Sequence, residues 1–287
     1  MNIMTARKLE AIPLSPCIGA ELRGLDLSKP LSEADVAAIN KAWLDHVVIL
    51  FRGQKLTQED QLRVTSYFGP IGKLGRPAKY FPPGFSSILP GIMMISNIRE
   101  NGEPIGALPD GEMMFHHDMI HHDLPHDATM LYALEIPMHG GDTLFASGYA
   151  AYDTFDPALK AKLDGKRARH HYNYGSTQRG DGRGTEAHAA SSHPIFRVHD
   201  KTGRKAVYVN RLMTVGIEGM DDAEAAPLLE ALFDHSEKPE FVYRHQWRVG
   251  DLLLWDNRCS THARDDFPAD QRRLMLRTTV AGNAVPV

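Results

Sequence analysis

The stretch FVYRHQWRVGDLLLWDNRCSTHARDDFPADQRRLMLRTTVAG (residues 241–282) decides the fold class. Three of its segments, FVYRHQW, DLLLW and RRLMLRTTVAG, are short runs with apolar residues, separated by polar turns, which is typical of β-strands. Many short strands with few helices indicate an antiparallel sandwich or barrel decorated by helices. We therefore predict a mainly β fold with flanking helices.

Two capped helices are expected in the N-terminal part of the chain. LSEADVAAINKAWLDH (31–46) has Ser32 as its capping residue and keeps its apolar residues at roughly helical spacing. LTQEDQLRVTSYFG (56–69) has Thr57 as its capping residue and stops at its glycine. The apolar run Val47–Phe51 between them predicts a buried strand.

Two long loops separate the remaining elements. Residues 69–111 are rich in proline and glycine and predict a lid-like loop, and a second polar loop is expected at Gly175–Ser192. No change of composition marks a linker, so we expect residues 1–287 to form a single domain. The other predicted elements are strands at Ile92–Ser96, Thr129–Ile136, Asp142–Ala146 and Arg167–Tyr172, a helical stretch at Tyr149–Leu163 broken at Pro157, a hairpin over 194–210 with its turn at Asp200–Gly203, and a helix over 221–239.

The composition is that of an ordinary globular chain and argues against several classes of protein. The 287 residues include 32 Lys+Arg and 36 Asp+Glu, a net charge of −4, which argues against a nucleic-acid binder. No apolar run approaches the roughly 18 residues of a membrane span, and no signal peptide is visible. Two cysteines, Cys17 and Cys259, make no disulfide framework, so a cytoplasmic location is expected. A homo-oligomer is compatible with these features.

Histidines are concentrated in one short segment. The chain has 15 histidines, and His116, His117, His121, His122 and His126 fall within eleven residues. Histidine is the commonest metal ligand in proteins, but a solvated polar loop is the expectation for most of these five.

FHHD (115–118) predicts part of a metal site. His116 and Asp118 stand two apart, and residues i and i+2 of a strand point to the same face. A third ligand can come from far along the chain, and the candidate is His262, which follows DLLLW. Two histidines and one carboxylate form the facial triad that leaves three positions open on Fe(II). Such a pair also arises by chance in a histidine-rich loop, so spacing alone leaves the ligand interpretation open.

A buried anion site is predicted on the C-terminal strand. Arg273 and Arg277 stand four apart, on one face of that strand, and the intervening LML indicates apolar packing around them. A guanidinium matches a carboxylate with two hydrogen bonds, and Thr143 offers a hydroxyl to the same kind of ligand. The alternatives are an exposed sheet face with salt bridges for the arginines and an ordinary strand threonine.

Taken together, these motifs resemble a known family. FHHD, HGGDTLFASGYAAYD (139–153) and WDNRCSTHARDDFPADQRRLMLRTTVAG (255–282) are similar to the taurine dioxygenase / 2,4-D dioxygenase (TauD/TfdA) family of Fe(II)- and 2-oxoglutarate-dependent dioxygenases. The resemblance covers nearly the whole chain, including FRGQKLTQEDQ (51–61) and PEFVYRHQWRVGDLLLWDNR (239–258). It implies a double-stranded β-helix (jelly roll, cupin-like).

The resemblance also implies a cofactor, co-substrates and residues that bind them. Fe(II), 2-oxoglutarate and O2 are implied, with His116, Asp118 and His262 binding the iron. The spacing of the co-substrate residues agrees with the family. Thr143 lies 25 residues after Asp118, and Arg273 and Arg277 lie 11 and 15 residues after His262. Thr143 and Arg273 would hold the distal carboxylate of 2-oxoglutarate.

Arg277 would hold the anionic end of the substrate or the near carboxylate of 2-oxoglutarate. The implied reaction hydroxylates a C–H next to a heteroatom of a small anionic substrate, and the product decays to an aldehyde or keto compound. An alkylsulfonate or sulfate ester is the first expectation, and an aryloxyalkanoate or another carboxylate is the alternative. A non-catalytic metal-binding jelly-roll protein is an alternative of another class, but it would need no 2-oxoglutarate clamp.

The substrate contacts are where the sequence departs from the taurine enzyme. FGPIGKLGRP (68–77) has no histidine where that enzyme has one, Glu112 stands at an asparagine position, and Met213 replaces an aromatic residue. These changes argue against taurine itself. The residues expected in the substrate pocket are Glu112, Met119, Ile120, Tyr174 and Met213.

Other polar residues have open roles. Lys73, Arg76 or Arg211 could supply positive charge to the substrate, although such side chains are mostly solvated. His117 is expected to face away from the metal by strand alternation, and the following pair of histidines, 121 and 122, could lie in the pocket.

Overall fold

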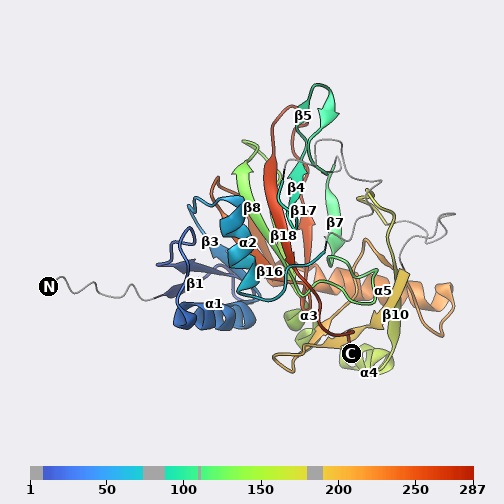
Figure 1. Ribbon diagram of the computed structural model, residues 1–287. Coiled ribbons are helices and arrows are strands. Elements are labelled where there is room, and N and C mark those ends of the chain that lie inside the picture. The colour runs from blue at the N-terminus through green and yellow to red at the C-terminus, as the bar shows by residue number, and fades with distance from the viewer. Residues whose placement is uncertain (1–8, 74–87, 109–110, 180–189) are drawn as a thin grey trace.

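The computed structural model describes residues 9–73, 88–108, 111–179 and 190–287 (Figure 1). Strands predominate, and helices lie around them, so the predicted mainly β fold with flanking helices is confirmed. Within these ranges no helix has both the length and the hydrophobicity that crossing a bilayer requires. The single domain, the cytoplasmic location and the oligomeric state stay predictions.

The elements have the following bounds. The helices are α1 (Glu33–His46), α2 (Gln58–Ser66), α3 (Gly148–Thr154), α4 (Pro157–Leu163) and α5 (Asp222–Ser236), with a 3-10 turn at Pro239–Phe241. The strands are β1 (Glu10–Pro13), β2 (Ala20–Arg23), β3 (Val48–Phe51), β4 (Met93–Ser96), β5 (Arg99–Glu100), β6 (Glu103–Pro104), β7 (Met113–His116), β8 (Ala128–Glu135), β9 (Thr143–Ser147), β10 (Arg167–His171), β11 (Ala190–Pro194), β12 (Phe196–Val198), β13 (Lys205–Val207), β14 (Thr214–Ile217), β15 (Val242–His245), β16 (Leu252–Asp256), β17 (Ser260–Arg264) and β18 (Leu274–Val280).

Two sheets contain most of the strands. The larger sheet has the strand order β1-β2-β3-β16-β8-β18-β4, and the smaller has the order β15-β9-β17-β7. All pairs are antiparallel except β2 with β3. Neighbouring strands come from distant parts of the sequence, so β7 and β17 lie side by side although more than a hundred residues separate them.

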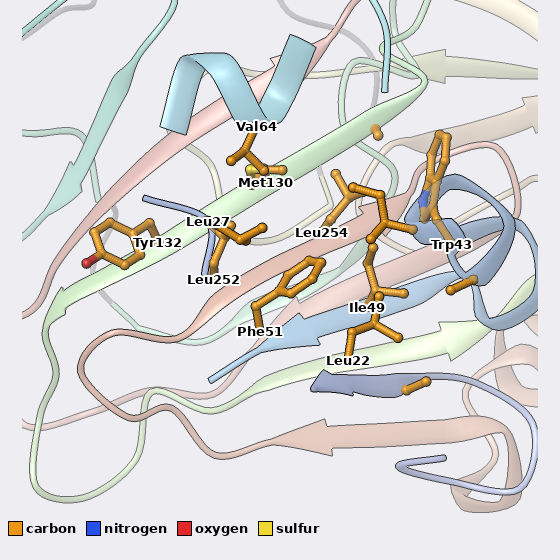
Figure 2. Packing of buried hydrophobic residues seen from close by; sticks show 14 of the residues in the cluster. Leu22, Leu27, Trp43, Ile49, Phe51, Val64, Met130, Tyr132, Leu252 and Leu254 are labelled. Atoms are coloured by element: carbon orange, nitrogen blue, oxygen red, sulfur yellow. The ribbon is translucent and has the colours of Figure 1, made fainter. Parts of the chain in front are cut away.

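The central strands of the larger sheet are buried on both faces, and strand alternation divides their side chains between them. Ile49 of β3 packs with Trp43 of α1 and Val64 of α2 on the outer face (Figure 2). The next residue, Leu50, belongs to the inner cluster with Phe145 of β9, on the smaller sheet. Burial on both faces explains why β3 and β16 are continuous apolar runs.

The predicted helices are confirmed together with their caps. Ser32 precedes α1 and accepts a hydrogen bond from the backbone N–H of Asp35. Thr57 precedes α2 and forms a capping box with Asp60. The second helix ends at Ser66, before the predicted glycine, and the later helices α3, α4 and α5 lie where the sequence predicts them.

The strand predictions are mostly confirmed. Strands β4, β8, β9 and β10 match to within one residue at each end, and β12 and β13 form the expected hairpin. Val47 is not part of β3, because it ends α1 with a φ of 68°. Strands β5, β6, β11, β14 and β17 were not predicted.

Both predicted loops lie partly outside the described residues. In the range 69–111, residues 74–87 and 109–110 are not described, so the lid remains a prediction. The described part holds β4, which pairs with β18 at the edge of the larger sheet, and the β5–β6 hairpin. The second loop includes the undescribed residues 180–189, and its end is corrected because β11 begins at Ala190.

A buried charged network joins β16 to the hairpin. Asp256 Oδ2 lies 2.7 Å from Arg258 Nη2 and 3.0 Å from His199 Nε2, and Arg258 Nη1 lies 2.9 Å from Asp200 Oδ1. The first three side chains are almost fully buried. Such a network is costly to break, because removing one partner leaves an uncompensated buried charge.

Asp256→Asn is therefore expected to lower the free energy of unfolding by about 3–5 kcal/mol. Asp153→Asn is the matched control, because Asp153 pairs with Arg204 at 3.3 Å on the exposed surface. That change should cost less than about 1 kcal/mol. Urea denaturation measures both values, and equal costs for the two variants would contradict the account.

Candidate active site

A cavity opens between the two sheets. Strands β7, β9 and β17 of the smaller sheet and β4, β8, β16 and β18 of the larger sheet all contribute side chains to its lining. Much of that lining is apolar, including Met93, Met113, Met119 and Met213. The polar side chains include a His–Asp group beside β7 and β17. They also include an arginine group, which consists of Arg264 at the end of β17 and Arg273 directly before β18.

Three residues from two distant segments meet at one point of the cavity. His116 is the last residue of β7, Asp118 follows it closely, and His262 lies on β17 directly opposite His116. His262 Nε2 lies 3.9 Å from Asp118 Oδ2. One ligand atom from each residue lies within 4.8 Å of the other two, so the group could hold a metal ion.

Both imidazoles of this group are suited to metal binding. His116 Nδ1 lies 2.9 Å from the carbonyl oxygen of Met114, so Nδ1 carries the proton and Nε2 keeps its lone pair for a cation. Burial lowers the pKa of His116 and lowers the pKa of His262 to about 3. The neutral imidazole is the form that coordinates metals.

Asp118 is held as a carboxylate by its neighbours. Its Oδ1 lies 3.3 Å from Arg277 Nη1, and its Oδ2 accepts a 2.6 Å hydrogen bond from Thr129 Oγ1. Burial alone would raise the pKa of Asp118, but the charge of Arg277, together with the hydrogen bond from Thr129, holds that pKa well below its usual range. Asn257 Nδ2 donates to Thr129 at 3.0 Å, and Trp255 Nε1 donates to Asn257 Oδ1 at 3.0 Å. A chain of three hydrogen bonds therefore fixes Asp118 Oδ2.

The arginine group offers an anion site. Arg273 is 2% exposed, and in the described part of the chain no carboxylate forms an ion pair with it. Burial, and then the charge of Arg264, lowers the pKa of Arg273 to about 9. Thr143 Oγ1 accepts a 2.9 Å hydrogen bond from Trp247 Nε1, so its own hydroxyl hydrogen remains available to a ligand. A buried guanidinium and a directed hydroxyl together suit a carboxylate.

Most of the chain matches one known family. Residues 10–279 match the family described as taurine catabolism dioxygenase TauD, TfdA family. The chain belongs to the TauD/TfdA family. It is an Fe(II)- and 2-oxoglutarate-dependent dioxygenase, and its fold is the double-stranded β-helix that the family resemblance implied.

Individual TauD/TfdA members show how similar the chain is to known proteins. It is 31% identical to the alpha-ketoglutarate-dependent 2,4-dichlorophenoxyacetate dioxygenase of Cupriavidus pinatubonensis, covering 96% of this chain and 98% of that one. It is also 31% identical to an alpha-ketoglutarate-dependent sulfate ester dioxygenase of Pseudomonas putida, covering 98% and 92%. The crystal structure of AAD-2 with Mn(II) and N-oxalylglycine matches with a TM-score of 0.80 at 28% identity, covering 98% and 100%.

The cavity of this TauD/TfdA member includes some of the predicted substrate residues and not others. Met119, Met213 and Tyr174 line it. Glu112 is exposed and does not line the cavity, which corrects that prediction. Ile120 is corrected as well, because it is fully buried in an apolar cluster with Leu212 and Met213 and does not line the cavity itself. The physical reason is a turn: β7 ends at His116, and Met119 has a φ of 63°, so strand alternation does not extend to Ile120.

The predicted sources of positive charge do not line the cavity. Lys73 is exposed, and Arg76 lies outside the described residues. Arg211 is already neutralised, because its guanidinium lies 2.8 Å from Glu230 and 3.0 Å from Glu237. Within the described lining, the cationic side chains are those of the arginine group and Arg277.

The open histidines have different positions. His117 lies away from the cavity, with its ring 4.5 Å from that of Tyr208, as strand alternation predicts. His121 lines the cavity, whereas His122 and His126 do not. Their nearness in sequence therefore does not make them one site.

The sequence interpretation missed further lining residues, above all Arg264. It lies two residues after His262, the same spacing that singled out FHHD. This spacing could have identified Arg264. However, residues two apart share a face only on a strand, and β17 was not predicted.

A second group of potential ligands lies in the buried charged network. His199, Asp256 and Cys259 also have ligand atoms within 4.8 Å of one another. Here His199 Nδ1 accepts hydrogen bonds from the backbone N–H groups of Lys201 and Thr202, so Nε2 carries the proton and donates to Asp256. Arg258 also binds both oxygens of Asp256. These hydrogen bonds indicate a structural role for the group.

Thr129→Val is expected to weaken Fe(II) binding about 10- to 100-fold, because Asp118 Oδ2 loses its orienting donor. Thr278→Val is the matched control, since Thr278 is equally buried but bonds to Thr65. Equilibrium dialysis measures the dissociation constants. Equal affinities in the two variants would show that Thr129 does not position the carboxylate.

Proposed function

We propose that His116, Asp118 and His262 bind Fe(II), and that this centre hydroxylates a C–H bond of a small anionic substrate. The observation that carries the proposal is the convergence of two neutral imidazoles and one carboxylate in a cavity that also holds a buried arginine, with which no described carboxylate forms an ion pair. Such a donor set is typical of non-heme Fe(II) oxygenases. With 2-oxoglutarate and O2, the bound metal supplies oxidative decarboxylation, which yields succinate, carbon dioxide and a hydroxylated product.

Arg273 and Thr143 are proposed to bind the distal carboxylate of 2-oxoglutarate. The guanidinium fork neutralises the charge with two hydrogen bonds, and the Thr143 hydroxyl donates a third. Arg277 already lies 3.3 Å from Asp118. It is proposed to hold the anionic end of the substrate or the near carboxylate of 2-oxoglutarate.

The lining of the cavity favours an aryloxyalkanoate as the substrate class. We therefore prefer this alternative to the alkylsulfonate or sulfate ester that was the first expectation from the sequence. Arg277 can hold the carboxylate, while Met113, Met119 and Tyr172 offer thioether and aromatic surfaces to a ring. The relatives named above act on 2,4-dichlorophenoxyacetate and on sulfate esters, and both classes carry an anionic end. Hydroxylation of the carbon next to the ether oxygen gives a product that collapses to a phenol and a 2-oxo acid.

Succinate formation over a small substrate panel tests this proposal. Purified enzyme with Fe(II) and 2-oxoglutarate is given phenoxyacetate, hexyl sulfate or taurine, and released phenol, sulfate and sulfite are measured. We expect phenol in equal amount to succinate. Sulfate release with hexyl sulfate alone would contradict the aryloxyalkanoate class and support the sulfate ester alternative.

A further inference from the structure

One imidazole in the cavity has no role in the chemistry proposed above. His121 follows the turn at Met119, and the two side chains line the cavity while Ile120 between them points into the core. His121 is 3% exposed. The turn therefore brings one polar side chain into a wall that is otherwise made mostly of methionine and aromatic residues.

Both ring nitrogens of His121 are buried without a hydrogen-bond partner among the described residues. Burial lowers the pKa of His121 to about 3, so the ring is neutral at physiological pH. A neutral imidazole offers one N–H donor and one acceptor. Buried polar groups are almost always paired, so a partner beyond the described residues is expected here, and the cavity gives a bound molecule access to the ring.

The neighbours of His121 are rings. Its centroid lies 4.4 Å from that of His122, 5.2 Å from that of Tyr172 and 5.6 Å from that of Tyr174. Tyr172 and Tyr174 stand edge to face at 5.5 Å. These contacts fix the orientation of the imidazole and give the cavity an aromatic wall in which His121 supplies a directed polar contact.

We propose that His121 is a specificity-determining residue, which hydrogen-bonds a neutral polar group of the substrate, such as a ring hydroxyl. This inference rests on the proposed function, in which the substrate is a small aryloxyalkanoate bound in this cavity. A hydroxyl both donates and accepts, and so it matches a neutral imidazole. A site built to bond a hydroxyl also rejects analogues that lack one, because its buried polar groups are then left unpaired.

The test compares 4-hydroxyphenoxyacetate with 4-methylphenoxyacetate, which have nearly the same shape. In the wild type, kcat/KM for the hydroxyl compound should be at least about tenfold higher. His121→Phe should bring this ratio close to one, and His121→Gln, which keeps a donor and an acceptor, should retain a preference. His139→Phe is the control, since His139 is exposed and does not line the cavity, and it should leave the ratio unchanged. The same ratio in the wild type and in His121→Phe would overturn the proposal.

A binding experiment separates this inference from the substrate class. If neither phenoxyacetate is turned over, the aryloxyalkanoate proposal fails, but 4-methylphenol and p-xylene still probe His121 directly. Their affinities are measured by NMR on the enzyme loaded with Zn(II) and N-oxalylglycine. About tenfold tighter binding of 4-methylphenol, lost in His121→Phe, would support the inference. Equal binding of the two compounds to the wild type would overturn it.

Discussion

Arg273→Met raises the KM for 2-oxoglutarate roughly a hundredfold or more in our account, because the distal carboxylate loses its only proposed cationic partner. Methionine keeps much of the volume of the arginine stem, so the packing around position 273 is largely preserved. Succinate formation at varied 2-oxoglutarate concentration measures the effect. The size of the change follows from burial: at 2% exposure, water cannot replace the guanidinium.

The neighbouring arginine provides the control. Arg272 is exposed and pairs with Glu135 at 2.7 Å on the surface. Arg272→Met should leave the KM for 2-oxoglutarate unchanged within about twofold, because exposed pairs contribute little. If both variants have the same KM as the wild type, Arg273 does not bind the co-substrate.

Asp118→Asn is expected to reduce Fe(II) affinity more than a hundredfold and to abolish measurable turnover. The asparagine removes the one anionic donor of the group and leaves the Arg277 guanidinium, 3.3 Å away, without its counter-charge. Substitution of residues that orient the metal ligands lowers metal affinity about 10–100-fold, and loss of a direct ligand should lower it further. Equilibrium dialysis with Fe(II), under exclusion of oxygen, gives the dissociation constant.

Asp123→Asn is the matched control for this prediction. Asp123 lies in the same histidine-rich segment but is exposed and does not line the cavity. The Asp123→Asn variant should bind Fe(II) with the same affinity as the wild type. Wild-type affinity in Asp118→Asn would remove Asp118 from the metal site, whatever the activity of the variant.

The helices and the apolar strands could be predicted because local signals agree with the final packing. Ser32 and Thr57 cap helices whose apolar residues face the larger sheet, and β3 is apolar because both of its faces are covered. Strand β17 could not be predicted in this way. Its sequence, STHAR, is polar because it carries His262 and Arg264 into the cavity.

The candidate site was predictable where spacing and chemistry coincide. FHHD and the later His262 meet as expected, since β7 and β17 pair with these histidines opposite each other. The substrate side was less predictable, because it depends on a turn. The positive φ of Met119 sends Ile120 into the core and His121 into the cavity, and no periodicity in the sequence announces that reversal.

The most direct test of the central claim is an absorption spectrum recorded without oxygen. If His116, Asp118 and His262 hold Fe(II), and Arg273 and Thr143 hold 2-oxoglutarate, adding both to the wild type should produce a weak metal-to-ligand charge-transfer band in the visible range. His262→Ala should show no such band. Absence of the band in the wild type, or its persistence in His262→Ala, would contradict the account.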